Sequence, residues 1–155
     1  MLERARQECP PPPAAGPITL APGVLLVLAD QLDWQQTPIA GLRYKPLFID
    51  RQRRYASSLV SMAPGITYPR HRHTQPEELF LLSGDIQVGG YRLHPGDYCR
   101  AEAGTVHEAI RTETGCLFIA LAAVDDEYLP PAPPPPLTQA TAAAPSAPPM
   151  PPLPS

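Results

Sequence analysis

The sequence lacks a long hydrophobic run, a cysteine framework and an excess of basic charge. Its 155 residues carry a net charge of -3, which argues against a broad surface for nucleic acid. The apolar run at 24–29 is far too short to cross a bilayer, and the acidic residues near the start, with no cleavage site behind them, predict no secretory signal. The three cysteines are odd in number and widely spaced, which argues against a disulfide framework. We therefore expect a cytoplasmic protein without nucleic-acid or membrane partners.

Proline is abundant and is concentrated toward the two ends of the chain. There are 24 prolines, with one block at 10–13 and most of the others beyond residue 129. Segments of this composition have too little branched apolar surface to offset the entropy of ordering. We predict disorder in 1–17 and in 130–155, and a single domain in 18–129, which is long enough for a small core.

Between these ends, short strand patterns recur and helical periodicity is weak. The basic segment 51–54 reads as a solvated turn between two strands, and Gly89–Gly90 is a strong hairpin signal because both residues can take positive φ. The strand-like segments are 44–50, 56–62, 78–84, 85–97, 97–103, 105–110 and 116–124. This spacing predicts an all-β sandwich or small barrel.

The last strand-like segment, 116–124, is apolar on both faces. One face can line a barrel, and the other must be covered by segment 18–48 or by a second subunit. We therefore predict a homodimer.

Three of the four histidines form a candidate metal site. Residues i and i+2 of a strand point to the same side, so His71 and His73 share a face. After a turn, Glu77 can approach them from the neighbouring strand, and His107 lies on another strand after a glycine turn. Three neutral imidazoles and a carboxylate suit a divalent first-row metal and leave coordination positions open. His94 lies in a turn and is interpreted as a surface residue.

These residues resemble the two sequence motifs of the cupin superfamily. The first motif is matched in every spacing by Gly65, His71, His73, Glu77 and Gly84. Glu78 fits only if one gap is shortened, so Glu77 is taken as the ligand. The second motif is matched by Gly96, Gly104 and His107, while Glu102 replaces its proline and Arg111 its asparagine.

Over residues 30–122 the pattern is similar to the ChrR-type cupin domain. The resemblance implies a cupin double-stranded β-helix (a jelly-roll barrel) with His71, His73, Glu77 and His107 as metal ligands, and often a dimer. In ChrR this domain follows a zinc-binding anti-sigma domain. No His/Cys cluster precedes the barrel here, so we expect a stand-alone domain that is not an anti-sigma factor by itself.

We expect one divalent ion per chain, and this ligand set accepts Fe, Zn, Mn or Ni, so its identity is left open. A divalent ion with one carboxylate leaves a formal charge of about +1, which favours a small anionic guest. If strand alternation continues from His107, Arg111 points inward and can hold the far end of such a guest. The alternative is that Arg111 faces solvent at the barrel rim.

Three functions are compatible with the sequence. The first is a metal-dependent oxidoreductase, an iron(II) dioxygenase cleaving a carbon–carbon bond of a diketone- or hydroxyketone-type molecule, as the resemblance suggests. The second is a non-catalytic sensor or ligand-binding module, and the third is a structural barrel that holds zinc. No acid–base pair is recognisable beyond the ligands, so no catalytic residue is assigned, although a redox metal needs none.

Overall fold

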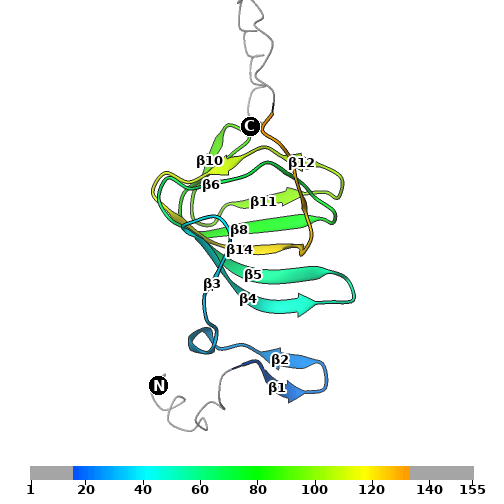
Figure 1. Cartoon of the computed structure of the whole chain (residues 1–155). Helices are drawn as coiled ribbons and strands as arrows, with labels where there is room; N and C mark the ends of the chain where they lie inside the picture. Colours follow the sequence, from blue (N-terminus) through cyan, green and yellow to red (C-terminus); the bar gives the residue numbers. More distant parts are fainter. Residues whose placement is uncertain (1–15, 133–155) are drawn as a thin grey trace, which may run out of the picture.

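The computed structural model describes residues 16–132, whose regular structure is almost entirely β (Figure 1). The elements are β1 (Ile18–Ala21), β2 (Val24–Leu26), the 3-10 helix η1 (Ala29–Gln31), β3 (Gln35–Gln36), β4 (Leu42–Asp50), β5 (Tyr55–Met62), β6 (Thr67–Tyr68), β7 (His71–Arg72), β8 (Glu77–Gly84), β9 (Ile86–Val88), β10 (Tyr91–Leu93), β11 (Tyr98–Ala101), β12 (Val106–His107), β13 (Ile110–Arg111), β14 (Cys116–Ala123) and β15 (Glu127–Tyr128). The all-β prediction is confirmed. Within this range, no helix has the length and apolar character needed to cross a membrane.

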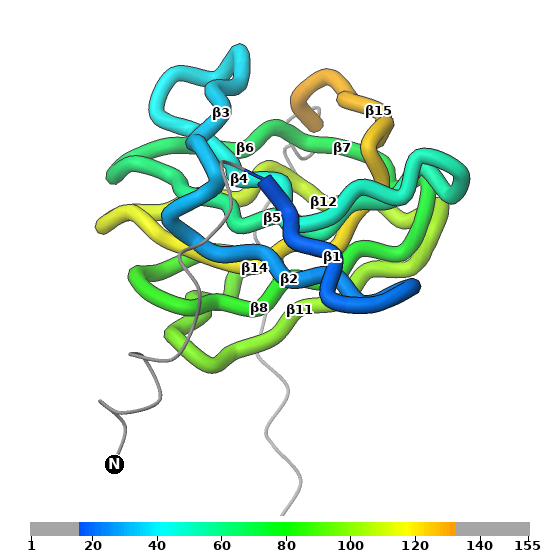
Figure 2. The backbone as a smooth tube through the Cα atoms, turned by 90° about the horizontal axis from the view of Figure 1, so that it is seen from below, coloured from blue at the N-terminus to red at the C-terminus, as the bar shows by residue number. Residues whose placement is uncertain are grey.

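The strands form a jelly-roll barrel in which a large sheet faces two smaller ones. The large sheet has the order β11-β8-β14-β5-β4-β3, and the smaller sheets have the orders β10-β9-β13-β6 and β12-β7-β15. Figure 1 shows β11, β8, β14, β5 and β4 stacked from top to bottom. The hairpin of β1 and β2 is a separate two-stranded sheet that lies below the barrel in Figure 1 and in front of it in Figure 2.

Two predicted hairpins form as expected. The long pair β4 and β5 is antiparallel and is closed by the basic turn at 51–54. The pair β9 and β10 is closed by Gly89 and Gly90, whose φ angles are 54° and 86°. Positive φ at both central residues is the requirement of the tight two-residue turn that joins twisted strands, so glycine is needed at both positions.

The predicted strand at 105–110 is broken into two. β12 pairs with β7, whereas β13 pairs with β6 and β9 in a different sheet. Because the two halves bond to different partners, the alternation of side chains does not continue from His107. Ile110 is buried and Arg111 is exposed.

The core lies between the large sheet and the smaller ones. It consists of residues that the strand patterns place on inward faces, namely Leu42, Met62, Leu79, Leu81, Ile86, Ile110, Cys116 and Phe118. On the outer face of the large sheet, Leu117, Ile119 and Leu121 are half-buried, while Phe80 and Leu82 are exposed. The strand β14 therefore does have two apolar faces, and within residues 16–132 its fully buried residues, Cys116 and Phe118, lie on the inner one.

The predictions for the proline-rich ends fall mostly on residues 1–15 and 133–155, which lie outside the described range. The strands extend from Ile18 to Tyr128.

A buried carboxylate ties the end of β8 to the loop before β14. Asp85 is 3% exposed and accepts hydrogen bonds from the backbone amides of Glu113 and Thr114, at 3.2 and 2.8 Å, and from the Thr114 hydroxyl. Next to it, a Cβ on Gly84 would stand 1.8 Å from the carbonyl oxygen of Gly115. Only glycine lets the two segments approach this closely, which explains the last residue of the first motif.

We predict that Asp85→Ala lowers the free energy of unfolding by about 1–3 kcal/mol, because it leaves two partly buried backbone amides without their acceptor. The hydrogen bond from Thr114 is the main reason that the pKa of Asp85 is lowered to about 2. A lowered pKa contributes stability above the ordinary value near 3.8, and this contribution is lost as the pH falls toward 2. Denaturant titrations between pH 2 and about pH 5 should therefore show a weaker pH dependence for the variant.

Asp30→Asn, in the exposed part of η1, is the matched control and should unfold like the wild type. Equal unfolding curves for Asp85→Ala and Asp30→Asn would contradict the structural role of Asp85.

Candidate metal centre

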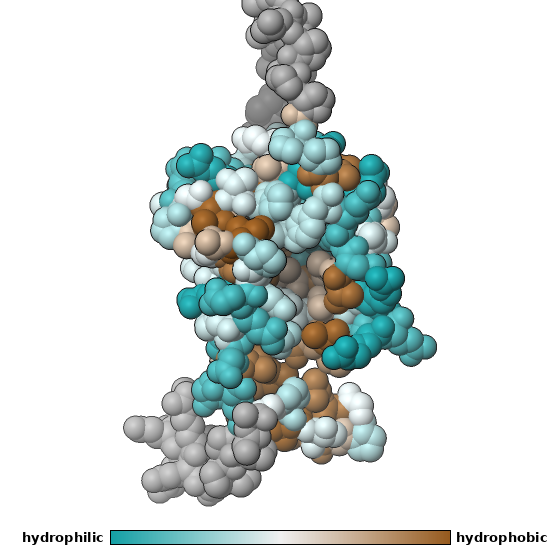
Figure 3. All heavy atoms as spheres, viewed as in Figure 1, coloured by the Kyte–Doolittle hydropathy of each residue, from teal (hydrophilic) through white to brown (hydrophobic). Residues whose placement is uncertain are grey.

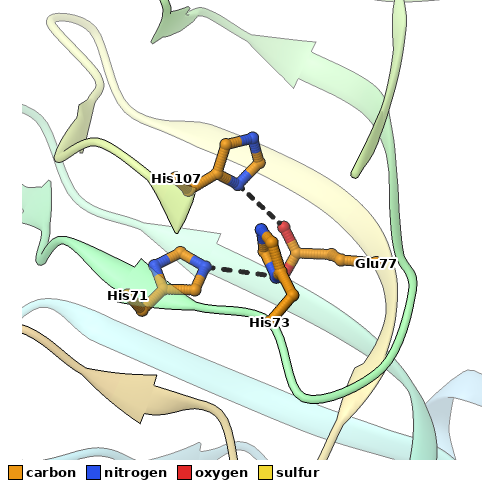
Figure 4. Close-up of side chains that lie close together, drawn as sticks. All are labelled: His71, His73, Glu77 and His107. Carbon is orange, nitrogen blue, oxygen red and sulfur yellow. Dashed lines mark ion pairs between the residues drawn. The ribbon is translucent and has the colours of Figure 1, made fainter. Parts of the chain in front are cut away.

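The four residues singled out as metal ligands lie together at one end of the barrel. His71 is on β7, His73 follows it, Glu77 begins β8 and His107 ends β12. Each offers one ligand atom, and these atoms all lie within 4.8 Å of one another. Figure 4 shows the imidazoles of His71, His73 and His107 converging on the carboxylate of Glu77.

Backbone pairing sets this convergence. His107 is the direct partner of His71 in the β7–β12 pair, so their side chains leave adjacent strands on the same side. His73 is held by two backbone hydrogen bonds. Its amide donates to the carbonyl of Thr105 at 3.0 Å, and its carbonyl accepts from the amide of Gly104 at 2.7 Å. Gly104 has a φ of 83°, a conformation that favours glycine.

The cluster is largely buried, and four of its ring nitrogens lack hydrogen bonds. His71 and His73 are each 1% exposed. Nε2 of His71, both ring nitrogens of His73 and Nδ1 of His107 find no hydrogen-bond partner within residues 16–132. Buried polar atoms without partners are costly. A divalent cation bound between them would satisfy these nitrogens, so the residues present fit a metal ion.

One tautomer follows from the structure. Nδ1 of His71 lies 3.0 Å from the carbonyl oxygen of Pro69. Because a carbonyl only accepts, Nδ1 carries the hydrogen, and in the neutral ring Nε2 presents its lone pair. That Nε2 points at Glu77, with a distance of 3.8 Å to Oε2. An imidazole fixed by a backbone carbonyl in this way is the usual arrangement of a metal ligand.

The charges at the site favour an anionic glutamate beside the imidazoles. Burial by itself would raise the pKa of Glu77, but the contacts with His107 and His71 outweigh it and lower the pKa to about 2. Nδ1 of His107 is 3.2 Å from Oε1 of Glu77. Burial lowers the pKa of His73, which favours its neutral form. For His71, burial lowers the pKa, yet Glu77 and the Pro69 carbonyl raise it overall.

Two residues near the cluster were missed by the sequence reasoning. Oδ2 of Asp126 lies 3.6 Å from Nδ1 of His73, and its Oδ1 accepts from the amide of Thr74 at 3.0 Å. Asp126 is 52 residues from Thr74, so no local spacing indicates this contact. Sγ of Cys99 lies 3.8 Å from Nε2 of His107, and burial raises the pKa of the Cys99 thiol.

One member of the cluster, Glu77, lines a cavity of about 1040 Å³ on the inner face of the large sheet, whereas the three histidines are not among its lining residues. Glu77 and Asp126 line it, as does Tyr68, whose hydroxyl is 2.9 Å from that of Tyr128. Most other lining residues are apolar, including Leu42, Val60, Leu79, Ile110 and Phe118. The cavity is therefore an apolar chamber with the histidine cluster beside it.

The remaining candidates lie away from this cavity. Arg111 is exposed on β13 and is not among the lining residues, whereas its neighbour Ile110 is. Of the two orientations considered for Arg111, the structure shows the solvent-facing one, because the strand is broken after His107. Glu78 is 3.9 Å from Arg100 and is not part of the cluster, and His94 is exposed, as expected.

A jelly-roll barrel with three histidines and a glutamate that could hold a metal ion defines a cupin. Residues 23–125 match the family described as the ChrR cupin-like domain. The chain belongs to this family.

Solved structures share the fold at low identity. A candidate acetylacetone dioxygenase from Methylibium petroleiphilum PM1 has a TM-score of 0.63 and 22% identity, covering 68% of this chain and 81% of that one. The acetylacetone dioxygenase from Acinetobacter johnsonii has a TM-score of 0.59 and 14% identity, and the match covers 79% of this chain and 83% of that one. A chain of the structure of Rhodobacter sphaeroides SigE in complex with the anti-sigma ChrR has a TM-score of 0.50 and 21% identity, and the match covers 61% of this chain and 50% of that one. No curated protein matches the sequence.

We predict that the purified protein binds about one divalent metal ion per chain through the four clustered residues. His73→Ala should lower the metal affinity more than tenfold, since even loss of an outer hydrogen-bond partner of a ligand costs about 10–100-fold. The imidazoles must be deprotonated to bind, so the metal content should fall on acidification below about pH 6. Elemental analysis after dialysis at a series of pH values measures both effects.

His94→Ala removes an exposed histidine outside the cluster and serves as the control. Equal metal content in His73→Ala, His94→Ala and the wild type would refute the assignment of the ligands.

Proposed function

We propose that this protein is a metal-dependent dioxygenase that cleaves a carbon–carbon bond in a diketone- or hydroxyketone-type small molecule. The observation that carries the proposal is the position of the histidine cluster beside an apolar cavity of about 1040 Å³. Ligand sites of enzymes are typically apolar chambers with a few convergent polar groups. The likeness to two structures named as acetylacetone dioxygenases supports the choice of substrate class.

When bound, a redox-active divalent metal such as Fe(II) supplies activation of oxygen and polarisation of the keto oxygens. The chain's own residues hold and orient the reactants. The apolar wall excludes water and packs against the carbon skeleton of the substrate. The paired hydroxyls of Tyr68 and Tyr128, at the edge of the cavity, offer hydrogen bonds to an enolate oxygen.

The reaction balances without another redox partner. When a β-diketone reacts with O₂, one carbon–carbon bond breaks and both oxygen atoms are incorporated into the two products. A carboxylic acid and an α-dicarbonyl compound result, and no external reductant is consumed.

A second function, a non-catalytic sensor or ligand-binding module, rests on a different observation. The family is named after the cupin-like domain of ChrR, and the structure of ChrR was solved in complex with SigE. In that role the same cavity binds a guest without turning it over. A structural zinc site is a third possibility from the sequence, but a cavity of this size is not needed for it.

We predict that the protein loaded anaerobically with Fe(II) consumes oxygen when a β-diketone or an aryl hydroxyketone is added. The Zn(II)-loaded protein should not, because zinc has no redox chemistry. An oxygen electrode measures the rate, and the mass spectrum of the products identifies the cleaved bond.

The Fe(II)-loaded His94→Ala variant should match the wild type, because this residue is exposed and lies outside the cavity. If no such compound causes oxygen uptake but one raises the melting temperature, the sensor function is favoured. At a hundredfold excess over its dissociation constant, such a guest stabilises the folded protein by about 2.7 kcal/mol.

We also propose that the protein forms a homodimer in which the β1–β2 hairpin of one copy packs on the large sheet of the other. Leu20 and Leu25 of the hairpin are 62% and 44% exposed, and Phe80 and Tyr98 on β8 and β11 are 42% and 52% exposed. Figure 3 shows apolar side chains gathered on the hairpin and on the adjoining barrel. Exposed apolar patches of this kind favour an interface, and the second copy offers a matching surface.

We predict a particle of twice the 16.8 kDa chain mass in light scattering at micromolar concentration. Phe80→Glu and Leu25→Glu should each shift the particle toward the monomer, because each places a charge in the proposed interface. Tyr91→Glu changes an aromatic residue that is 77% exposed on a different sheet and should remain dimeric. A monomeric wild type would rule the dimer out.

A further inference from the structure

The cavity is lined by two arginine side chains and by two carboxylates, one of which belongs to the histidine cluster. Arg51 and Arg54, from the turn between β4 and β5, line the cavity together with Glu77 and Asp126. The sequence reasoning interpreted the whole basic segment as a solvated turn. That interpretation fits Arg53, which does not line the cavity and forms an exposed ion pair with Asp50.

The register of the sheet places these two sides across from each other. Leu121 is the partner of Glu78, and Ala122 is the partner of Ala56. Glu77 and Ala56 therefore lie in one row, two strands and about 10 Å apart. Arg54 lies two residues before Ala56, in the turn just before β5, and its carbonyl accepts from the amide of Val124 at 3.1 Å. Its backbone is then about 12 Å from that of Glu77.

The two arginines differ in their partners. Arg54 forms an ion pair with Asp125, which anchors the turn to the end of β14. Arg51 has no ion pair or hydrogen bond with any residue in 16–132. A guanidinium that borders a cavity without a protein partner can form a two-point, charge-assisted contact with a carboxylate.

We propose that Arg51, supported by Arg54, recognises an anionic group on the guest of this cavity. The keto oxygens of the guest lie at the histidine cluster, and its anionic group lies at the β4–β5 turn. The substrate class is then a diketo acid or a related hydroxyketo acid rather than a neutral diketone. This inference rests on the proposed function for the position of the keto oxygens, and it replaces Arg111 as the residue that selects an anion.

The test compares two probes that differ only in the charged end, 4,6-dioxoheptanoate and 2,4-heptanedione. Both carry the same β-diketone, and only the first carries a carboxylate. Titration calorimetry with the Zn(II)-loaded protein measures binding without turnover. We expect the wild type to bind the acid at least tenfold more tightly than the neutral diketone, and Arg51→Gln to reduce this ratio by about tenfold, toward one, which is the effect of losing a charge-assisted hydrogen bond.

Two further variants separate recognition from general surface charge. In Arg54→Asn the new residue is asparagine, which tolerates the φ of 55° at this position. This variant should reduce the ratio less than Arg51→Gln does. Arg53→Gln removes an equal charge from the same turn outside the cavity, and its ratio should equal that of the wild type. A wild-type ratio near one, an equal effect of Arg51→Gln and Arg53→Gln, or no binding of either probe would overturn the inference.

The outcome is distinguishable from that of the proposed function. Selective, Arg51-dependent binding of the acid without oxygen uptake by the Fe(II)-loaded protein supports the inference and refutes the dioxygenase. Oxygen uptake with both probes at equal efficiency, unaffected by Arg51→Gln, supports the dioxygenase and refutes the inference.

Discussion

The structure depends on one constraint: three imidazoles and a carboxylate are buried together, with several ring nitrogens left without hydrogen bonds. Such a cluster is unfavourable unless its members satisfy one another or share a cation. The lowered pKa of Glu77, to about 2, shows how strongly the imidazoles favour the charged carboxylate. The surrounding backbone holds the rings in place, so the four side chains converge in an arrangement that could hold a metal ion.

Several residues other than the four of the cluster contribute to the barrel around it. Gly104 takes a φ of 83° beside His73, and Gly84 lets β8 approach the loop at Gly115. Asp126 comes from the segment between β14 and β15 and stands 3.6 Å from His73. The inner face of the large sheet supplies the apolar wall. The site therefore belongs to the barrel as a whole and not to the histidine segment alone.

Much of this could be predicted because it depends on local rules. The alternation of a strand placed His71 and His73 on one face, and the Gly89–Gly90 pair predicted a tight hairpin, as observed. Alternation failed at Arg111, since it assumes an unbroken strand and the chain changes sheets after His107. The cavity-lining role of Arg51 depends on how the β4–β5 turn sits over the large sheet, which composition does not reveal.

The small sheet that carries two of the histidines has a consequence for local opening. β12, β7 and β15 are each two residues long, so few backbone hydrogen bonds resist fraying there, in contrast to the eight- and nine-residue strands β14, β5 and β4. Units with few bonds and contacts open at low free energy and exchange their amide hydrogens first. An ion shared by β7, β12 and β8 would join this sheet to the large one. An ion bound there would therefore slow the exchange of the backbone amides of β7, β12 and β15.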